Sequence, residues 1–459
     1  MAPVDVDNGV MPDLQKYVNV VQKCTPMRRC GRVSQVVGVI VESVGPTMTI
    51  GDVCWISSMD GTRKILAEVV GLRGRRLLLM PFGQVDGISN ESEIIPHREP
   101  ISVPVGEGLL GRILDGMGKP IDGKGPIDIE GKRPIHASPP NPLTRMRITR
   151  PIATGIRSID GLLTCGEGQR VGIFSGSGVG KSVLLGMIAR NTEADVNVIA
   201  LIGERGREVR EFIERDLGEE GLRRSVVVIV TSDEAAILRI KGALGATTIA
   251  EYFRDKGLRV MLMMDSVTRI AMAQREIGLA VGEPPTTKGY TPSVFTLLPK
   301  LLERSGTGPI GSITGLYTVL VESDDLTEPV TDAVRSILDG HIVLSRRLSS
   351  MSHYPAVDVL ESVSRVMNDV IPEAHRDAAY QIKEMLATYR EAEDLINIGA
   401  YAQGSNPKID RALSIIDSVN EFLKQRIEEK VSYPETIKKL IGLSEVPVKS
   451  HADEMGVES

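Results

Sequence analysis

One glycine-rich stretch constrains the fold of this chain more than any other feature: residues 174–182, FSGSGVGKS. It follows the apolar run RVGIFS and precedes KSVLLGMIAR, a helical pattern, which is the strand–loop–helix context of a phosphate-binding loop. Glycines let such a loop curl until its N–H groups point at phosphate oxygens, and the start of the helix adds positive potential. The sequence therefore predicts a nucleoside triphosphate site at the end of a buried strand.

The loop departs from the strict motif at its first position, where Ser175 stands in place of glycine. Lys181 is expected to neutralise β- and γ-phosphate charge, and the Ser182 hydroxyl to ligate Mg²⁺. Because position 175 is the strand exit, a small side chain suffices there if φ is negative, and we predict a backbone outside the left-handed region. The expected nucleotide-binding residues of the loop are Ser175, Gly176, Ser177, Gly178, Val179, Gly180, Lys181, Ser182 and Val183.

Six continuous apolar runs between about residues 150 and 345 predict the strands of a parallel sheet. They are RVGIFS, NVIALIG, SVVVIVT, RVMLMMD, SITGLYTVL and HIVLS. Runs of this kind, without polar alternation, are typical of strands that are covered on both faces. The segments between them are long enough for crossover helices, so the expected class is α/β with a parallel phosphate-loop core.

The regions on either side of this core have different sequence patterns. Residues 31–100 contain closely spaced short β-rich runs, which predict a small barrel or sandwich. Residues 104–143 are dense in Gly and Pro and predict an ordered linker. After about residue 370 the patterns are helical, and Ser405 or Asn406 is expected to cap a helix whose apolar face continues to Ile427.

The predicted organisation has five parts. An N-terminal arm is expected to carry a short amphipathic helix with Leu14, Tyr17, Val18 and Val21 on one face, although a loose tail is an equal alternative. The expected limits are 1–30 for the arm, 31–100 for the β-barrel domain, 101–370 for linker and core, 371–445 for a helical domain, and 446–459 for a flexible tail.

Composition excludes several classes of function. The formal net charge of −6 gives no global positive field, and aromatic residues are only 3%, so the chain is not expected to bind nucleic acid. The N-terminus has no secretory signal pattern, and the longest apolar runs are of strand length, too short to span a membrane. The four cysteines form no C-x-x-C pair, and reduced thiols in a cytoplasmic protein are expected.

Two acidic residues follow buried strands of the predicted core. Asp265 ends RVMLMMD, where a carboxylate suits Mg²⁺, or else caps the next helix. Glu204 ends the strand NVIALIG and is followed by Arg205 and Arg207. The carboxyl edge of a parallel sheet faces the crevice where ligands bind, so Glu204 is a candidate to orient or deprotonate water. Its alternative is a surface ion pair with Arg205 or Arg207.

Six motifs, in order, resemble the catalytic-subunit class of rotary ATP synthases, and most closely its flagellar and type III secretion export ATPases. They are LTCGEGQRVGIFSGSGVGKS, GERGREV, MLMMDSVTR, GEPPTTKGYTPSVF, GSITGLYTVLVESDDLTEPVTD and HYPAVDVLESVSRVM. GLLTCGEGQR and ILDGHIVLSRRL are similar to the export branch in particular, and LINIGAYAQGSNPKID favours the flagellar member over the injectisome one. The export branch also resembles this chain in its small non-glycine residue at position 175. The resemblance implies an N-terminal β-barrel, a RecA-like core and a C-terminal helical domain.

The resemblance also implies roles for single residues. Glu204 corresponds to the carboxylate that polarises the attacking water, and Arg205 and Arg269 to arginines near the γ-phosphate and the site. Tyr354 corresponds to the aromatic residue that packs on adenine, although spacing alone equally allows a core tyrosine before a proline. Arg365 corresponds to the arginine finger that a neighbouring subunit supplies in trans.

The implied activity is Mg²⁺-dependent ATP hydrolysis by a homohexamer that energises flagellar protein export at the inner face of the cytoplasmic membrane. One chain carries both Glu204 and Arg365, which favours a ring of identical subunits. The implied partners are a stator-like regulatory protein at the N-terminal arm, a central stalk protein facing residues 399–410, export gate membrane proteins and chaperone–cargo complexes.

Four other functions remain open at this point. An injectisome ATPase would share every motif above. The catalytic subunit of an ATP synthase would need a second homologous chain in its ring. A ring-shaped RNA translocase would show basic or aromatic RNA-binding signatures, which this chain lacks. A non-catalytic nucleotide-binding subunit would be expected to lack Glu204, which this chain has.

Overall fold

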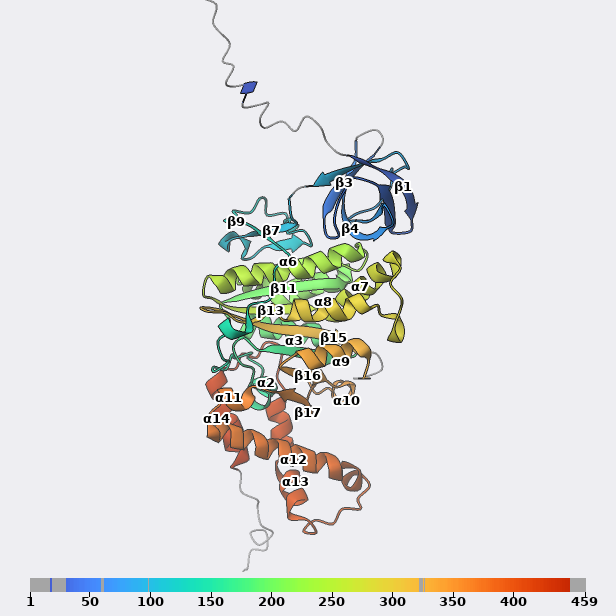
Figure 1. Ribbon diagram of the computed structural model, residues 1–459. Helices are drawn as coiled ribbons and strands as arrows, with labels where there is room; N and C mark the ends of the chain where they lie inside the picture. The colour runs from blue at the N-terminus through green and yellow to red at the C-terminus, as the bar shows by residue number, and fades with distance from the viewer. Residues whose placement is uncertain are drawn as a thin grey trace, which may run out of the picture. The chain divides into compact units, whose positions relative to one another are not determined.

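The computed structural model describes residues 17–18, 30–58, 62–97, 99–321, 325 and 327–445. They form two compact units that divide after Pro100 (Figure 1). Apart from residues 17–18, the predicted N-terminal helix lies outside the described residues, as does the predicted tail 446–459. The finer limits at residues 30, 370 and 445 stay predictions.

The first unit is a closed six-stranded barrel, as one of the two alternatives predicted. Its strands are β1 Gly31–Val37, β2 Ile40–Val44, β3 Val53–Ser57, β4 Lys64–Arg73, β5 Arg76–Pro81 and β6 Glu93–His97. The strands close in the order β1-β2-β5-β4-β3-β6, and every pair is antiparallel. Alternate side chains point inward and fill the barrel with small and branched residues. This core includes Val33, Val41, Cys54, Ile56, Ala67, Val69, Leu77, Leu79 and Ile94.

The second unit is built on a nine-stranded sheet with the order β17-β16-β10-β15-β13-β11-β12-β8, with β14 beside β15. The strands are β8 Ile113–Asp115, β10 Arg170–Ser175, β11 Val196–Glu204, β12 Ser225–Thr231, β13 Arg259–Asp265, β14 Gly306–Thr307, β15 Ser312–Leu320, β16 Gly340–Leu344 and β17 Val357–Ser364. Among the strands of the described residues in this sheet, β14 and β17 pair antiparallel with their neighbours and the others pair in parallel. All six predicted strands are present, and the predicted α/β class is confirmed.

The predicted linker at 104–143 is in part wrong, because it contributes a strand to this sheet. β8 pairs in parallel with β12, and β7 Ser102–Val105 forms a separate ribbon with β9 Gly131–Pro134. A strand of three residues between glycines shows no periodicity, so the sequence pattern could not reveal it. The edge strand β17 was also missed, since its alternating VDVLESVS differs from the apolar runs of the covered strands.

Helices cover both faces of the sheet (Figure 1). Right-handed crossovers place the helices that follow β10 and β11 on one face, and those that follow β12, β13 and β15 on the other. The first group is α3 Lys181–Asn191, α4 Gly206–Glu211, the π-helix Phe212–Leu217 and α5 Gly218–Arg223. The second is α6 Ala236–Asp255, α7 Val267–Val281, α8 Pro292–Leu302 and α9 Pro329–Ile337. Shorter helices are α2 Arg157–Leu162, α10 Arg346–Ser350 and α11 Met367–Val370, with 3₁₀ turns at Glu107–Leu109, Pro142–Thr144 and Thr287–Gly289.

Three helices end the described chain: α12 Glu373–Asn397, α13 Pro407–Leu423 and α14 Tyr433–Ser444. Asn406 caps α13 by accepting from the N–H of Lys408, as predicted. The expected continuation to Ile427 is wrong, because α13 ends at Leu423 and Ile427 is 44% exposed. The carbonyls of Phe422 and Lys424, which a longer helix would use internally, accept instead from a buried arginine. No helix among the described residues is long and apolar enough to cross a membrane.

A buried ion pair provides a test of this packing. Arg304 is 1% exposed and bonds to Glu251 at 2.6 Å, Thr248 at 2.8 Å and the carbonyl of Ile135 at 2.8 Å. Arg304→Ala leaves Glu251 buried and unpaired, so we expect unfolding to become easier by about 3–5 kcal/mol. Chemical denaturation followed by circular dichroism measures this. Arg207→Ala, which removes an exposed ion pair, should leave the transition where it is; an equal shift in both variants would contradict the assignment.

Candidate active site

The phosphate loop lies at the carboxyl end of β10, near the middle of the sheet. Ser175 is 2% exposed and pairs with Leu320 on one side and Leu344 on the other. Its backbone is not left-handed, since the described non-glycine residues with positive φ are Lys288 and Ser352. That prediction is confirmed. The loop turns instead at Gly178 and Gly180, where φ is 81° and 93°.

Lys181, the first residue of α3, faces two carboxylates. Its Nζ atom lies 2.5 Å from Asp265 Oδ1 and 3.5 Å from Glu204 Oε1. Burial alone would lower the pKa of Lys181, but the charges of Asp265 and Glu204 outweigh burial and raise that pKa. The lysine is therefore held protonated at the position where phosphate charge is expected.

Glu204 is brought to this lysine by an irregularity in β11. The pairing of β11 with β12 shifts register between Ile202 and Glu204, and Gly203 between them has φ 74°. Burial raises the pKa of Glu204 to about 7; Lys181 opposes this shift and Asp265 adds to it. A carboxyl group with a pKa near neutrality is suited to accept a proton from water.

The alternative role of Glu204, a surface ion pair, is wrong in this structure. Arg205 pairs with Glu208 at 3.5 Å, and Arg207 pairs with Glu211 at 2.9 Å. Both arginine side chains are largely exposed, whereas that of Glu204 is 13% exposed. The Arg205 side chain thus points toward solvent and pairs with Glu208, whereas the Glu204 side chain pairs with the lysine of the phosphate loop.

Asp265 ends β13 with its carboxylate buried in the site. Thr318 Oγ1 donates to Asp265 Oδ1 at 2.6 Å, from the neighbouring strand β15. The helix that follows is capped by Ser266, whose hydroxyl accepts from the N–H of Arg269, so the capping alternative for Asp265 is wrong. Asp265 contacts the lysine that begins α3, and Ser182 follows that lysine in the first turn of the helix. A carboxylate and a hydroxyl are oxygen donors of the kind that Mg²⁺ prefers. These residues fit the cation.

Arg269, in the first turn of α7, packs against the strand that carries Glu204. A Cβ atom on Gly203 would lie 2.8 Å from Arg269 Cβ, so glycine there is what lets the two segments approach. Within the described part of the chain, Arg269 Nε is buried without a hydrogen-bond partner. An unpaired buried guanidinium nitrogen costs free energy unless an acceptor arrives, which suits an anionic ligand.

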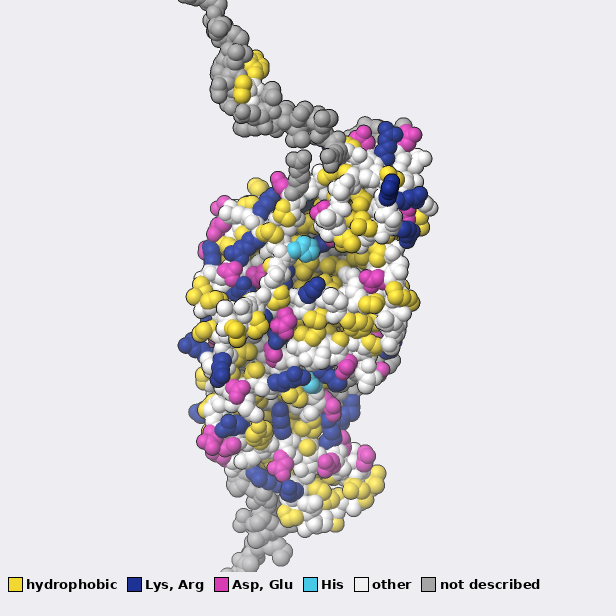
Figure 2. Space-filling model, in the orientation of Figure 1, with side chains coloured by type: hydrophobic (Ala, Val, Ile, Leu, Met, Phe, Trp, Pro, Cys, Tyr) yellow, Lys and Arg dark blue, Asp and Glu magenta, His cyan; other side chains and the backbone are white. Residues whose placement is uncertain are grey.

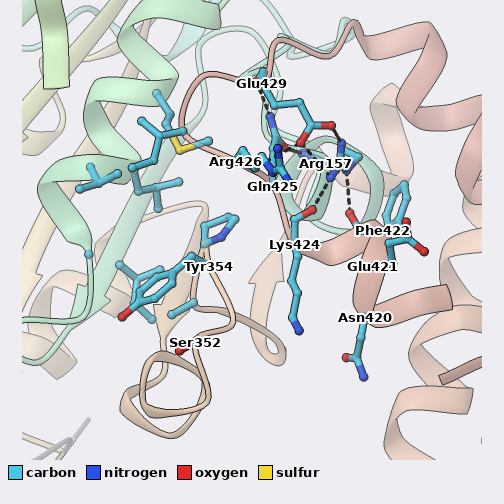
Figure 3. A pocket seen from close by; sticks show the side chains of 18 of the residues that line it. Arg157, Ser352, Tyr354, Asn420, Glu421, Phe422, Lys424, Gln425, Arg426 and Glu429 are labelled. Carbon is cyan, nitrogen blue, oxygen red and sulfur yellow. Dashed lines mark hydrogen bonds and ion pairs between the residues drawn. The ribbon is translucent and has the colours of Figure 1, made fainter. Parts of the chain in front are cut away.

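A pocket of about 1460 Å³ opens beside the phosphate loop (Figure 3). Tyr354 lines it and lies against the loop, because a Cβ atom on Gly180 would be 3.7 Å from two atoms of the tyrosine ring. The ring hydroxyl bonds to Ser349 Oγ at 2.9 Å, and Tyr354 is 45% exposed. The alternative of a core tyrosine is therefore wrong, and an aromatic face is available to a flat base.

Arg365 lies at the opposite end of the sheet from the phosphate loop. Because β17 runs antiparallel to β16, Ser364 pairs with Gly340 at the amino end of β16. The loop follows Ser175, which pairs with Leu344 at the carboxyl end, four residues or about 13 Å farther along. The exposed Arg365 side chain is thus separated from the Lys181 cluster of its own chain.

Sequence reasoning missed four residues around the site. Gly203 and Thr318 position Glu204 and Asp265, while Arg157 and Gln425 support the pocket wall. The glycine directly before a strand-end glutamate was an available signal. The other contacts join residues 53 to 268 positions apart, and no local pattern marks them.

Comparison with known sequences matches almost the whole chain. Residues 155–364 match the nucleotide-binding domain of the ATP synthase alpha/beta family, residues 33–97 its beta-barrel domain, and residues 371–442 the T3SS EscN ATPase C-terminal domain. A flagellum-specific ATP synthase of Bacillus subtilis is 53% identical over 433 residues, which cover 94% of this chain and 98% of that protein. A type 3 secretion system ATPase of Xanthomonas euvesicatoria is 52% identical, covering 91% and 95%.

Solved structures agree with these matches. The assembled ATPase EscN from the enteropathogenic E. coli type III secretion system superposes with a TM-score of 0.86 at 46% identity, over 90% of this chain and 100% of that one. EscN in complex with its central stalk EscO superposes with a TM-score of 0.83 at 45% identity, over the same shares.

Glu204→Gln tests the role of the carboxylate. The amide keeps the shape but accepts no proton, so we expect ATP binding to persist while the hydrolysis rate falls about a hundredfold or more. Nucleotide affinity and phosphate release are the measurements. Glu211→Gln, on the exposed face of α4, is the matched control and should hydrolyse ATP normally. Normal turnover in Glu204→Gln would remove Glu204 from the mechanism.

Tyr354→Ala tests the aromatic wall. Loss of a stacking face should raise KM for ATP about tenfold, with a smaller effect on kcat. Tyr354→Phe keeps the ring and loses only the bond to Ser349, so its KM should stay near the wild-type value. A Phe variant as weak as the Ala variant would assign the effect to the hydroxyl group instead.

Proposed function

We infer that this chain, which belongs to the ATP synthase alpha/beta family, is an ATPase that energises protein export through the flagellar type III secretion apparatus. The observation that supports this chemistry is the position of Lys181, which lies at the end of the phosphate loop and pairs with both Glu204 and Asp265. The export branch is supported by the match of residues 371–442 to the EscN C-terminal domain and by the flagellum-specific relatives. The predicted family, fold class and enzyme class are confirmed.

The proposed mechanism assigns each group one task. The loop N–H groups and Lys181 hold the β- and γ-phosphates, and Arg269, whose Nε is buried without a partner among the described residues, offers its guanidinium to the same charge. Glu204 orients the attacking water and accepts its proton as the water oxygen bonds to the γ-phosphorus and the bond to ADP breaks. Ser182 and Asp265 would hold Mg²⁺, which neutralises charge on the β- and γ-phosphate oxygens.

The proposed assembly is a homohexamer in which Arg365 acts in trans. Its placement about 13 Å away along the sheet supports this, since it lies far from the phosphate loop of its own chain. A head-to-tail ring presents Arg365 of each subunit to the site of the next. The assembled form of EscN supports the same arrangement here. The exposed Arg205 is proposed to approach the γ-phosphate side only when nucleotide is bound.

The proposed partners follow the export function. A central stalk protein, which EscN binds, would contact the end of the helical region around residues 399–410. A stator-like regulatory protein at the N-terminal arm, export gate membrane proteins and chaperone–cargo complexes complete the set. The ring is proposed to work in the cytoplasm at the inner face of the cytoplasmic membrane.

Two other functions are distinguished by simple observations. A purified chain that forms a ring alone favours export, while a need for a second homologous chain favours an ATP synthase. An RNA translocase would require a positive surface, but on the face drawn in Figure 2 basic and acidic side chains are interspersed. Hydrolysis stimulated by RNA would revive that alternative. The injectisome alternative is decided by whether flagellar or injectisome genes adjoin this one.

Mixing two inactive variants tests catalysis in trans. Glu204→Gln retains its finger, and Arg365→Ala retains its carboxylate. Alone, the first variant should lose about a hundredfold or more in kcat and the second about a thousandfold or more. In rings formed from equal amounts of both, about a quarter of the interfaces join an intact Glu204 to an intact Arg365. We therefore expect about a quarter of the wild-type ATPase activity to return.

The matched control mixes Glu204→Gln with the double variant that carries both substitutions. No interface in that mixture has both groups, so it should stay inactive. If the first mixture also stays inactive while sedimentation shows that mixed rings have formed, Arg365 does not act across the interface.

A further inference from the structure

A buried arginine joins the nucleotide-binding core to the turn between α13 and α14. Arg157 is the first residue of α2, and its side chain is 7% exposed. Its Nε atom donates to the carbonyl of Phe422 at 2.7 Å. Its two terminal nitrogens bond to the carbonyl of Lys424 and to the carboxylate of Glu429. Figure 3 shows the guanidinium pointing into this turn.

Gln425 extends these contacts to the aromatic wall of the pocket. Its side-chain oxygen accepts from the N–H of Arg157 at 2.9 Å, and its side-chain nitrogen donates to the carbonyls of Gly155 at 2.8 Å and Glu429 at 3.0 Å. Its own N–H donates to the carbonyl of Tyr354 at 2.9 Å. Hydrogen bonds thus link the backbone N–H of Arg157 to the Gln425 side chain, and the Gln425 N–H to Tyr354.

The same turn forms the wall of the pocket that faces the phosphate loop. The lining includes Gly178 and Gly180 of the phosphate loop as well as Tyr354 and Gln425, of which Figure 3 labels the last two. The ring of Phe422 is not available to stack on a base. A Cβ atom on Gly161 would lie 3.1 Å from the tip of the Phe422 ring, so the ring is anchored against α2.

We propose that Arg157 is a positioning residue for the nucleotide base. It contacts no reacting atom. Its guanidinium holds the turn at residues 422–429 through two backbone carbonyls that precede Gln425. The turn then places Gln425, whose N–H bonds to the carbonyl of Tyr354. The base would then enter a slot whose width is already set, while the phosphates are held independently by the loop. This inference rests on the proposal that Tyr354 packs against the base.

The chemistry of the contacts requires arginine in particular. Three nitrogens of one planar group reach two carbonyls and a carboxylate that lie in different directions. A lysine carries the charge but offers a single nitrogen, so it leaves acceptors of the turn without donors. Loss of the Arg157 guanidinium should therefore loosen the turn at residues 422–429 and leave the phosphate loop intact.

The test compares a ligand that has a base with one that has none. Arg157→Lys should weaken ATP binding about tenfold, as expected for lost charge-assisted hydrogen bonds. The affinity for inorganic tripolyphosphate, which reaches only the phosphate loop, should not change. Both are measured by competition with a fluorescent ATP analogue on the full chain.

Arg304→Lys is the matched control, because Arg304 is also buried and belongs to a different hydrogen-bond network. It should leave the ratio of the two affinities unchanged. Gln425→Ala keeps Arg157 and should reproduce the selective loss of ATP binding, which keeps the proposal testable if Arg157→Lys does not fold.

Two results would overturn the proposal: an equal loss of both affinities in Arg157→Lys and Gln425→Ala, or no loss in either. If Tyr354→Ala leaves ATP affinity unchanged, the placement of the base fails instead, while hydrolysis by the wild-type chain still stands as evidence of the ATPase function.

Discussion

The site depends on one ammonium group shared between two carboxylates. Lys181 lies 2.5 Å from Asp265 and 3.5 Å from Glu204. The longer distance means that the lysine offsets less of the free-energy cost of burying the Glu204 charge. The arrangement needs a parallel sheet, because only then do the carboxyl ends of neighbouring strands meet at one edge. In sheet order, β10, β15, β13 and β11 supply Lys181, Thr318, Asp265 and Glu204, one group for each strand or the loop after it.

The supporting parts of the structure serve this edge in two ways. The register shift at Gly203 positions Glu204, and the missing side chain of Gly203 leaves room for Arg269 from another element. The turn between α13 and α14 closes the other side of the pocket and is held by the core itself through Arg157. The phosphate loop and the opposite wall of the pocket are therefore supplied by separate parts of the chain.

Much of this was predictable because it is encoded locally. The phosphate loop, the core strands and the strand-end acids Glu204 and Asp265 are each recognisable within about ten residues, from an apolar run and the polar residues directly after it. The roles of Tyr354 and Arg365 came from resemblance alone. The strand β8 was too short to show a pattern. The helix expected to reach Ile427 ends at Leu423, and Arg157, some 265 residues before Phe422, donates hydrogen bonds to the carbonyls of Phe422 and Lys424. Such long-range competition for hydrogen bonds leaves no trace in local periodicity.

The antiparallel edge strand β17 has a consequence beyond the sheet. By reversing direction it carries Arg365 to the rim that its own phosphate loop does not face. If Arg365 acts in trans as proposed, a folded subunit still lacks one group of its own site, so dilution would stop hydrolysis at concentrations where the fold is intact. The local concentration of subunits would then set the rate of hydrolysis, and ATP would be hydrolysed mainly where subunits are concentrated enough to assemble.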